Sequence, residues 1–137
     1  MIELEIMVML CDAAEVVEGK FFILGGGWDI CNALINHMGL AVDIKVGWTE
    51  TNQDHRFELE LQTEDGEKVM VGEPSSPVIV EGNFNAGRPP NVPPGSPISV
   101  KQALNFTNLK LEPGKRYRWE IRIDGSPEAH VSFSTRK

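Results

Sequence analysis

LKLEPGKRYRWEIRID, residues 109–124, is the stretch of this sequence that decides the fold. Pro113-Gly114 indicates a turn, because proline fixes φ and glycine adopts φ values that other residues avoid. After the turn, apolar and charged residues alternate strictly up to Asp124-Gly125, a pair typical of a hairpin. Alternation with period two predicts a strand with one buried face. The residues expected on that buried face are Tyr117, Trp119, Ile121 and Ile123.

Tyr117 is the only tyrosine of the chain, and it enters this strand a few residues past the Pro-Gly turn. A tyrosine in that place is typical of the tyrosine corner of Greek-key sandwiches, in which the hydroxyl bonds to backbone a few residues upstream. We therefore expect Tyr117 to hold the turn against the strand.

The remainder of the chain repeats this pattern of short alternating runs and turn signals, with no convincing helix. The runs are residues 2–11, 21–24, 40–48, 55–62, 68–71, 77–84, 98–106 and 129–135. About eight strands in such an order favour an all-β fold, an antiparallel Greek-key, immunoglobulin-like sandwich that occupies residues 1–137 as one domain. A small closed barrel is the structural alternative.

Three segments between the runs are less regular. Residues 12–18 predict a short acidic connection, with room for one helical turn at Ala13–Glu15, and residues 30–38 predict a loop. The proline-rich residues 85–97 predict an ordered surface loop that crosses between sheets or reaches a neighbouring subunit. Trp48 and Trp119 fall on apolar strand faces, so we expect both in the core.

Charge and composition exclude several classes of protein. The formal net charge is -7, and the basic residues near Arg116 alternate with core residues, so we expect no nucleic-acid partner. No apolar run is long enough to span a bilayer, and Glu3 and Glu5 stand where a secretion signal has basic residues. We expect a cytoplasmic protein in which Cys11 and Cys31 are reduced.

The run Gly25-Gly26-Gly27-Trp28-Asp29 follows four apolar residues, 21–24, which indicate a strand buried on both sides or lying partly in an interface. The glycines predict a bulge or a close backbone approach. A phosphate-binding loop needs a following helix, which the sequence does not predict. Unlike the other two tryptophans, Trp28 is not assigned to the core by the sequence pattern.

No constellation in the sequence points to catalysis, a metal or a cofactor. The histidines, His37, His55 and His130, have no spacing that places a second ligand on the same local face. Calcium remains an alternative through acidic loop residues, as sandwich domains can hold hard cations at clustered loops. Those residues are Asp12, Asp29, Asp54 and Asp65.

Four stretches together resemble a family of small bacterial proteins with no established function. They are GKFFILGGGWD (19–29), DGEKV (65–69), GRPPNVPPGS (87–96) and EPGKRYRWEIRIDG (112–125), with a leading LCD at 10–12. The resemblance covers nearly the whole chain and implies a bacterial, cytoplasmic, single-domain protein. It supplies no activity and no catalytic residue.

Three hypotheses of function follow. The first is a non-enzymatic interaction module that contacts another protein or forms a homo-oligomer, with Met7 and Met9 at the interface because flexible methionines opposite a core face suit contacts. The alternative is a sandwich that binds a sugar or small polar molecule through Trp28, Asp29 and Arg88. The third, a hydrolase or metal-dependent enzyme, needs one of the three histidines beside Asp12, Asp29 or Asp54.

Overall fold

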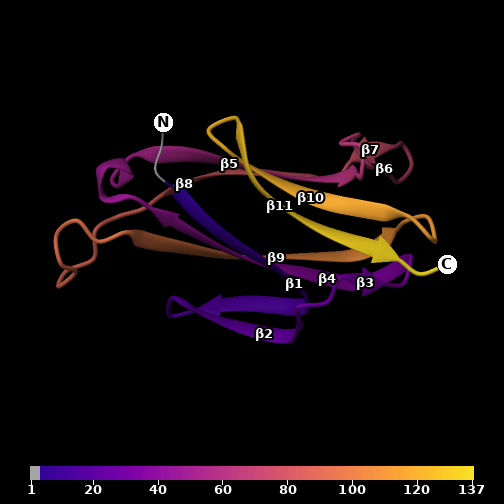
Figure 1. The fold of residues 1–137 in the computed structure, drawn as a ribbon, viewed down its shortest axis with the longest axis horizontal. Coiled ribbons are helices and arrows are strands. Elements are labelled where there is room, and N and C mark those ends of the chain that lie inside the picture. The colour runs from indigo at the N-terminus through magenta and orange to yellow at the C-terminus, as the bar shows by residue number, and fades with distance from the viewer. Residues whose placement is uncertain (1–3) are drawn as a thin grey trace.

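The computed structural model describes residues 4–137, which form two packed layers of strands (Figure 1). The long strands are β1 (Leu4–Val17), β4 (Leu34–Val46), β5 (Asp54–Thr63), β9 (Ile98–Lys110), β10 (Arg116–Ile123) and β11 (Ser126–Thr135). The shorter strands are β2 (Lys20–Gly26), β3 (Ile30–Cys31), β6 (Met70–Val71), β7 (Ser76–Pro77) and β8 (Ile79–Asn85). A short 3-10 turn, η1 (Trp48–Glu50), follows β4.

The strands form two main sheets that are not closed into a barrel. One has the order β2-β1-β4-β9 and the other has the order β3-β11-β10-β5-β8, while β6 and β7 pair separately. The frame of β1, β4 and β9 against β11, β10, β5 and β8 confirms the predicted all-β sandwich and has the connectivity of immunoglobulin-like folds. The proline-rich loop joins β8 to β9 and crosses between the sheets, as predicted.

The strand predicted from residues 117–123 lies at the centre of the second sheet, between β5 and β11. Trp119 is fully buried, stacks on Phe106 and donates from Nε1 to the sulfur of Met38 at 3.3 Å. The Tyr117 hydroxyl accepts a hydrogen bond from the Glu112 backbone N–H at 3.0 Å, which confirms the tyrosine corner. This bond fixes the Pro-Gly turn to the strand that follows it.

Two predictions of local structure are wrong. Residues 12–17 are not a connection or a helical turn, because β1 continues to Val17. A two-residue loop, Glu18-Gly19, then joins β1 to β2, and the two strands pair as a hairpin. The predicted loop 30–38 contains β3 and the first residues of β4, which begins at Leu34 rather than at Leu40. Residues 2 and 3, the predicted start of the first strand, lie outside the described residues.

The second half of β1 leaves the sheet and crosses over its outer face. β1 pairs with β4 from Leu4 to Cys11, where Cys11 lies opposite Gly39, and from there it pairs with β2 alone. A Cβ atom on Gly39 would lie 3.1 Å from the Ala13 Cα and from the Ala14 nitrogen. Glycine is therefore needed at 39, because the β1 backbone passes directly over it.

Small side chains and one amide hold this hairpin, residues 12–27, on the sheet. The Asn105 side chain, on β9, accepts from the Ala14 N–H at 3.2 Å and donates to the Ala14 carbonyl at 2.9 Å, as a neighbouring strand would do. Beneath the hairpin lies a small cluster that is separate from the main core. It contains Cys11, Ala14 and Ala41, with Met9, Phe21 and Ala103 packed against it.

Trp48 is not a core residue, contrary to the prediction. The strand β4 ends at Val46, and Trp48 lies half-buried in η1. The guanidinium of Arg88 stacks 3.9 Å from the Trp48 ring centroid and donates to the Trp48 carbonyl at 2.8 Å. It also donates to Thr51 Oγ1 at 2.6 Å. Arg88 therefore fastens the proline-rich loop to η1.

Candidate functional site

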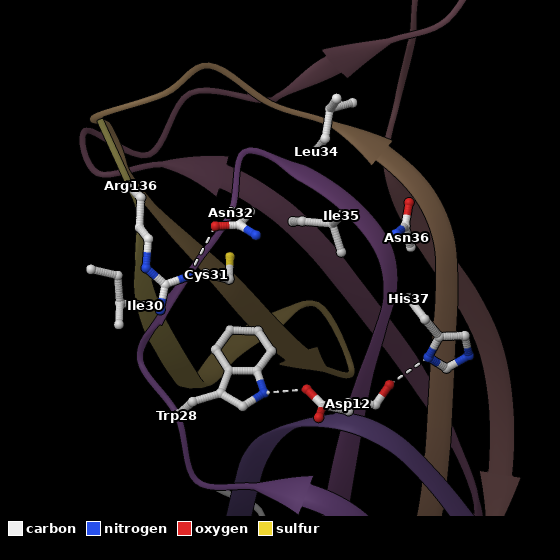
Figure 2. Close-up of a pocket in the computed structure, with 10 residues that line it drawn as sticks. All are labelled: Asp12, Trp28, Ile30, Cys31, Asn32, Leu34, Ile35, Asn36, His37 and Arg136. Atoms are coloured by element: carbon white, nitrogen blue, oxygen red, sulfur yellow. Dashed lines mark hydrogen bonds between the residues drawn. The ribbon is translucent and has the colours of Figure 1, made fainter.

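The site we consider first is an open hollow of about 560 Å³ beside Trp28, where the first hairpin, β3 and the start of β4 meet (Figure 2). Figure 2 shows the indole ring of Trp28 between Ile30 and the Arg136 side chain on one side and Asp12 on the other. The residues that line the hollow are Asp12, Trp28, Ile30, Cys31, Asn32, Leu34, Ile35, Asn36, His37 and Arg136.

Asp12 is the residue on which this arrangement depends. Its carboxylate Oδ1 accepts from Trp28 Nε1 at 3.1 Å, and its backbone carbonyl forms a short hydrogen bond with His37 Nδ1. Gly25 packs directly against the Asp12 carboxylate, and its φ of +57° lies in the left-handed region that favours glycine. The hairpin, the Trp28 loop and β4 are therefore all joined at Asp12, where β1 leaves its neighbour.

The two walls of the hollow are strand edges rather than strand faces. Residues 34–37 are four consecutive residues of β4, and 30–32 are three consecutive residues beginning at β3. Because side chains alternate between the faces of a strand, consecutive residues can line one hollow only along the edge of the strand. β4 has β9 on one side along its whole length, whereas β1 pairs with it only from Gly39 onward. Among the described residues, 4–137, residues 34–37 thus have one edge without a strand partner.

Arg136 gives this hollow a positive end. Its guanidinium donates to the Asn32 side-chain oxygen at 3.0 Å, and among residues 4–137 no carboxylate lies within 4.0 Å of it. The backbone N–H of Arg136 donates to the Cys31 carbonyl at 2.9 Å. Burial raises the pKa of the Cys31 thiol, which the charge of Arg136 only partly offsets. The thiol is therefore protonated near neutral pH.

The three residues predicted to share a ligand site are not brought together. Trp28 lines the hollow, and the Asp29 carbonyl beside it accepts from the Ser134 N–H at 2.9 Å. Arg88 lines a different hollow, next to the β8–β9 loop at the other end of the sandwich. The sequence interpretation missed Asp12 as the partner of Trp28. The signal that could have found it is the glycine run, since a close approach at Gly25 requires a partner.

A second unusual surface lies next to this hollow, on β2. This strand is the edge of its sheet, and the hairpin displays large apolar side chains to solvent. Leu24 is 70% exposed and Phe22 is 57% exposed, with Val17 and Ile23 exposed beside them. The segment 21–24 is thus not buried on both sides, although Phe21 packs partly against the small cluster. Met7 is exposed on β1, whereas Met9 is partly covered by the chain's own hairpin.

Among the histidines, His55 has the most constrained surroundings. Its ring is buried, with Nδ1 2.8 Å from Asp124 Oδ2 and Nε2 2.8 Å from the Glu50 carbonyl. Burial disfavours the charged ring, but the hydrogen bonds to Glu50 and Asp124 outweigh it and raise the pKa of His55 above 6.5. Burial likewise opposes the charged Asp124, but the bonds from His55 and the Arg56 N–H lower the pKa of Asp124 below 3.8. This pair joins the turn between β10 and β11 to the start of β5.

Within residues 4–137, no group of three or more histidine, cysteine, aspartate or glutamate side chains is arranged to hold a metal ion. His37 contacts the backbone of Asp12, not its carboxylate. The two cysteines, Cys11 and Cys31, are not paired with each other. The described residues also contain no helix with the length and hydrophobicity needed to cross a membrane.

The protein is therefore a sandwich with an added edge hairpin and an open hollow beside Trp28. A family model matches residues 6–136, and the chain belongs to that family, described as a family of unknown function (DUF6941). The predicted resemblance to a family without established function is thereby confirmed. A comparison with curated proteins gave no match.

Among solved structures, the chain is similar to part of the alkylpurine DNA glycosylase AlkC of Pseudomonas fluorescens, bound to DNA containing an abasic site analog. The TM-score is 0.57 at 12% sequence identity. The match covers 98% of this chain but 31% of that one, so this chain corresponds to less than a third of the glycosylase. At this identity the similarity concerns the fold alone.

Proposed function

We propose that this protein is a non-enzymatic interaction module that self-associates through the exposed edge of β2. The observation that carries the proposal is an apolar strand at the edge of a sheet with its large side chains in solvent. Natural edge strands are usually protected by charges, prolines or a covering segment, because their free backbone groups pair readily with another chain. On β2 the one charged residue, Lys20, lies at the hairpin loop and leaves residues 21–26 without such protection.

The backbone of β2 is suited to pairing. Glu18 and Gly19 have φ values of 51° and 71° and form a two-residue loop, so the flanking residues Val17 and Lys20 exchange both backbone hydrogen bonds. Hydrogen-bonded pairs then recur at every second position along the hairpin. Phe22 therefore points its backbone groups toward β1, while those of Phe21 and Ile23 point away from it, toward an incoming strand.

A two-fold axis at Ile23 places the apolar side chains of β2 opposite those of β2 in the second copy. In that antiparallel register, Ile23 pairs with Ile23 of the second copy, and Phe22 lies opposite Leu24 on the same face of the joined sheet. Cross-strand pairs of aromatic and aliphatic side chains stabilise sheets by about 0.2–1 kcal/mol each, and the symmetry forms the Phe22–Leu24 pair twice. The same surface on both copies is what a two-fold dimer requires.

The proposal includes a cytoplasmic location in a bacterium and no nucleic-acid partner. Unpaired cysteines are usual in a reducing compartment. The net charge of -7 repels phosphates. Although the AlkC glycosylase binds DNA, the residues shared at 12% identity give no reason to extend that property here. A sugar site built jointly from Trp28, Asp29 and Arg88 is not favoured, since Trp28 and Arg88 line different hollows.

The test is light scattering coupled to size exclusion at 5–50 µM on wild type, Leu24→Lys and the matched control Met70→Lys. Met70 is 52% exposed but lies on β6, outside the surface proposed. We expect a dimer for wild type and Met70→Lys, and a folded monomer for Leu24→Lys with an unchanged circular dichroism spectrum. A monomeric wild type, or a dimer that survives in Leu24→Lys, contradicts the proposal.

A further inference from the structure

We infer that the hollow beside Trp28 binds an extended peptide segment of another protein, which adds as a strand along residues 34–37 of β4. The segment it fits carries an apolar side chain and a carboxylate. This site is separate from the β2 edge and goes beyond self-association, because it gives the module a second surface for a different partner.

The backbone of β4 is the first argument for a peptide. Leu4–Cys11 of β1 pairs with Val46–Gly39 of β4 in an unbroken register. Extended by the same register, the next residues of β1 would lie beside Met38 and the residues before it, but β1 turns away at Asp12. Among residues 4–137, no strand pairs with that edge of residues 34–37, which line the hollow. An alternating row of N–H and C=O groups is matched by another extended backbone, which is the basis of strand addition.

The size of the hollow agrees with a short segment. Its volume of about 560 Å³ lies within the size range of small-ligand pockets. The four residues of β4 that line the hollow, 34–37, pair with a segment of about four residues, which spans roughly 13 Å at the rise of a β-strand. Residues 30–32 form the opposite wall.

The side chains that line the hollow indicate which residues the bound peptide carries. Ile30 and Leu34 are both large and exposed at the rim, and the Trp28 ring lies between the walls, so an apolar side chain is buried on binding. Arg136 has no carboxylate partner among residues 4–137, although the protein as a whole is acidic. A guanidinium binds a carboxylate in bidentate fashion, which places an acidic side chain or a C-terminus at this end.

The experiment uses a phage-displayed library of random octapeptides, selected on immobilised wild-type protein. Enriched sequences are synthesised with a fluorescent label and titrated by anisotropy against wild type, Leu34→Lys, Arg136→Glu and the control Met70→Lys. We expect enriched peptides that are apolar and acidic, with binding at least tenfold weaker to Leu34→Lys and to Arg136→Glu and unchanged for Met70→Lys. Two further peptides are N-methylated, one at the odd-numbered nitrogens and the other at the even-numbered nitrogens. Binding should be lost for the peptide whose methylated nitrogens face β4 and kept for the other.

Other outcomes overturn the inference in distinguishable ways. No enriched peptide, or peptides that bind Leu34→Lys and Arg136→Glu as they bind wild type, shows that the hollow is not the site. Loss of binding in the Leu24→Lys monomer assigns the peptides to the β2 edge instead. If Leu34→Lys turns a wild-type dimer into a monomer, the occupant of the hollow is a second copy of this chain. Failure of the β2 dimer alone leaves the peptide result unaffected.

Discussion

Gly25→Ala is the substitution that best tests how the hairpin is joined to the sheet. Gly25 has a φ of +57°, and a Cβ atom there would overlap the carboxylate of Asp12, whose Cγ lies 2.7 Å away. A left-handed conformation costs an L-residue about 1–2 kcal/mol. The carboxylate must also move and lose its bond from Trp28, which costs about 1–2 kcal/mol for an exposed charged hydrogen bond. We expect the free energy of unfolding of the hairpin to fall by about 2–4 kcal/mol.

Gly27→Ala is the matched control. Gly27 has a φ of +87°, but no atom lies within 4 Å of an added Cβ, so only the backbone strain of about 1–2 kcal/mol applies. In an Asp12→Ala background the overlap with the carboxylate is relieved and only a tight Cβ–Cβ contact of 3.3 Å remains, so the cost of Gly25→Ala should fall toward that of Gly27→Ala. The coupling energy of this double-mutant cycle isolates the contact between Asp12 and Gly25.

Hydrogen exchange read by mass spectrometry is the assay, because the hairpin can open without global unfolding. We expect faster exchange of the amides of residues 13–26 in Gly25→Ala, with the amides of β10 unchanged, and urea unfolding of all variants gives the global value. Equal exchange in Gly25→Ala and Gly27→Ala, or no coupling with Asp12→Ala, would refute the role given to Asp12.

Three further predictions concern the frame. Tyr117→Phe removes the acceptor of the Glu112 N–H and should lower the free energy of unfolding by about 1–2 kcal/mol in urea titrations; an unchanged midpoint contradicts the tyrosine corner as a stabilising contact. Arg122→Met leaves Glu60, whose side chain is 4% exposed, without its closest cation, and because Arg122 is itself partly exposed we expect a loss of about 2–4 kcal/mol; a neutral effect would mean that Lys68 suffices. For Asp124→Asn, the loss of stability relative to wild type should be largest between pH 4 and pH 6.5. As the pH falls below that range, Asp124 is protonated through its lowered pKa and the attraction between the two charges is lost. As the pH rises above it, His55 loses its proton through its raised pKa and the same attraction is lost. A difference in stability that stays constant from pH 3 to 9 excludes the charged pair.

Sequence reasoning predicted the frame where local chemistry and tertiary packing agree. Tyr117 past a Pro-Gly turn, and Asp124-Gly125 with positive φ at both residues, specify a corner and a hairpin in almost any sandwich. Residues 12–17 were misassigned because their short acidic pattern has no apolar face of its own. Their strand conformation comes from pairing with β2 across a two-residue loop and from the Asn105 side chain, which is distant in the sequence.

The candidate site was predicted only in part, for a similar reason. The sequence singled out Trp28 by its glycine context, and the structure places it in the hollow. Which polar groups accompany it depends on where β1 turns away from β4. That turn is specified by contacts of Asp12 with Trp28, His37 and Gly25, which are all non-local. Arg88 does not join Trp28 in the hollow as predicted, because sequence patterns do not show at which end of a sandwich a loop lies.

The crossing of β1 over Gly39 makes the hairpin a separable part of the molecule. The large core between the sheets contains none of the buried residues beneath the hairpin, Cys11, Ala14 and Ala41, which form a small separate cluster beside the Asn105 amide. A lineage of such proteins can therefore gain, lose or reshape the hairpin through a few substitutions at small residues while the frame keeps its stability. The hairpin and the sandwich frame are in this sense free to evolve at different rates.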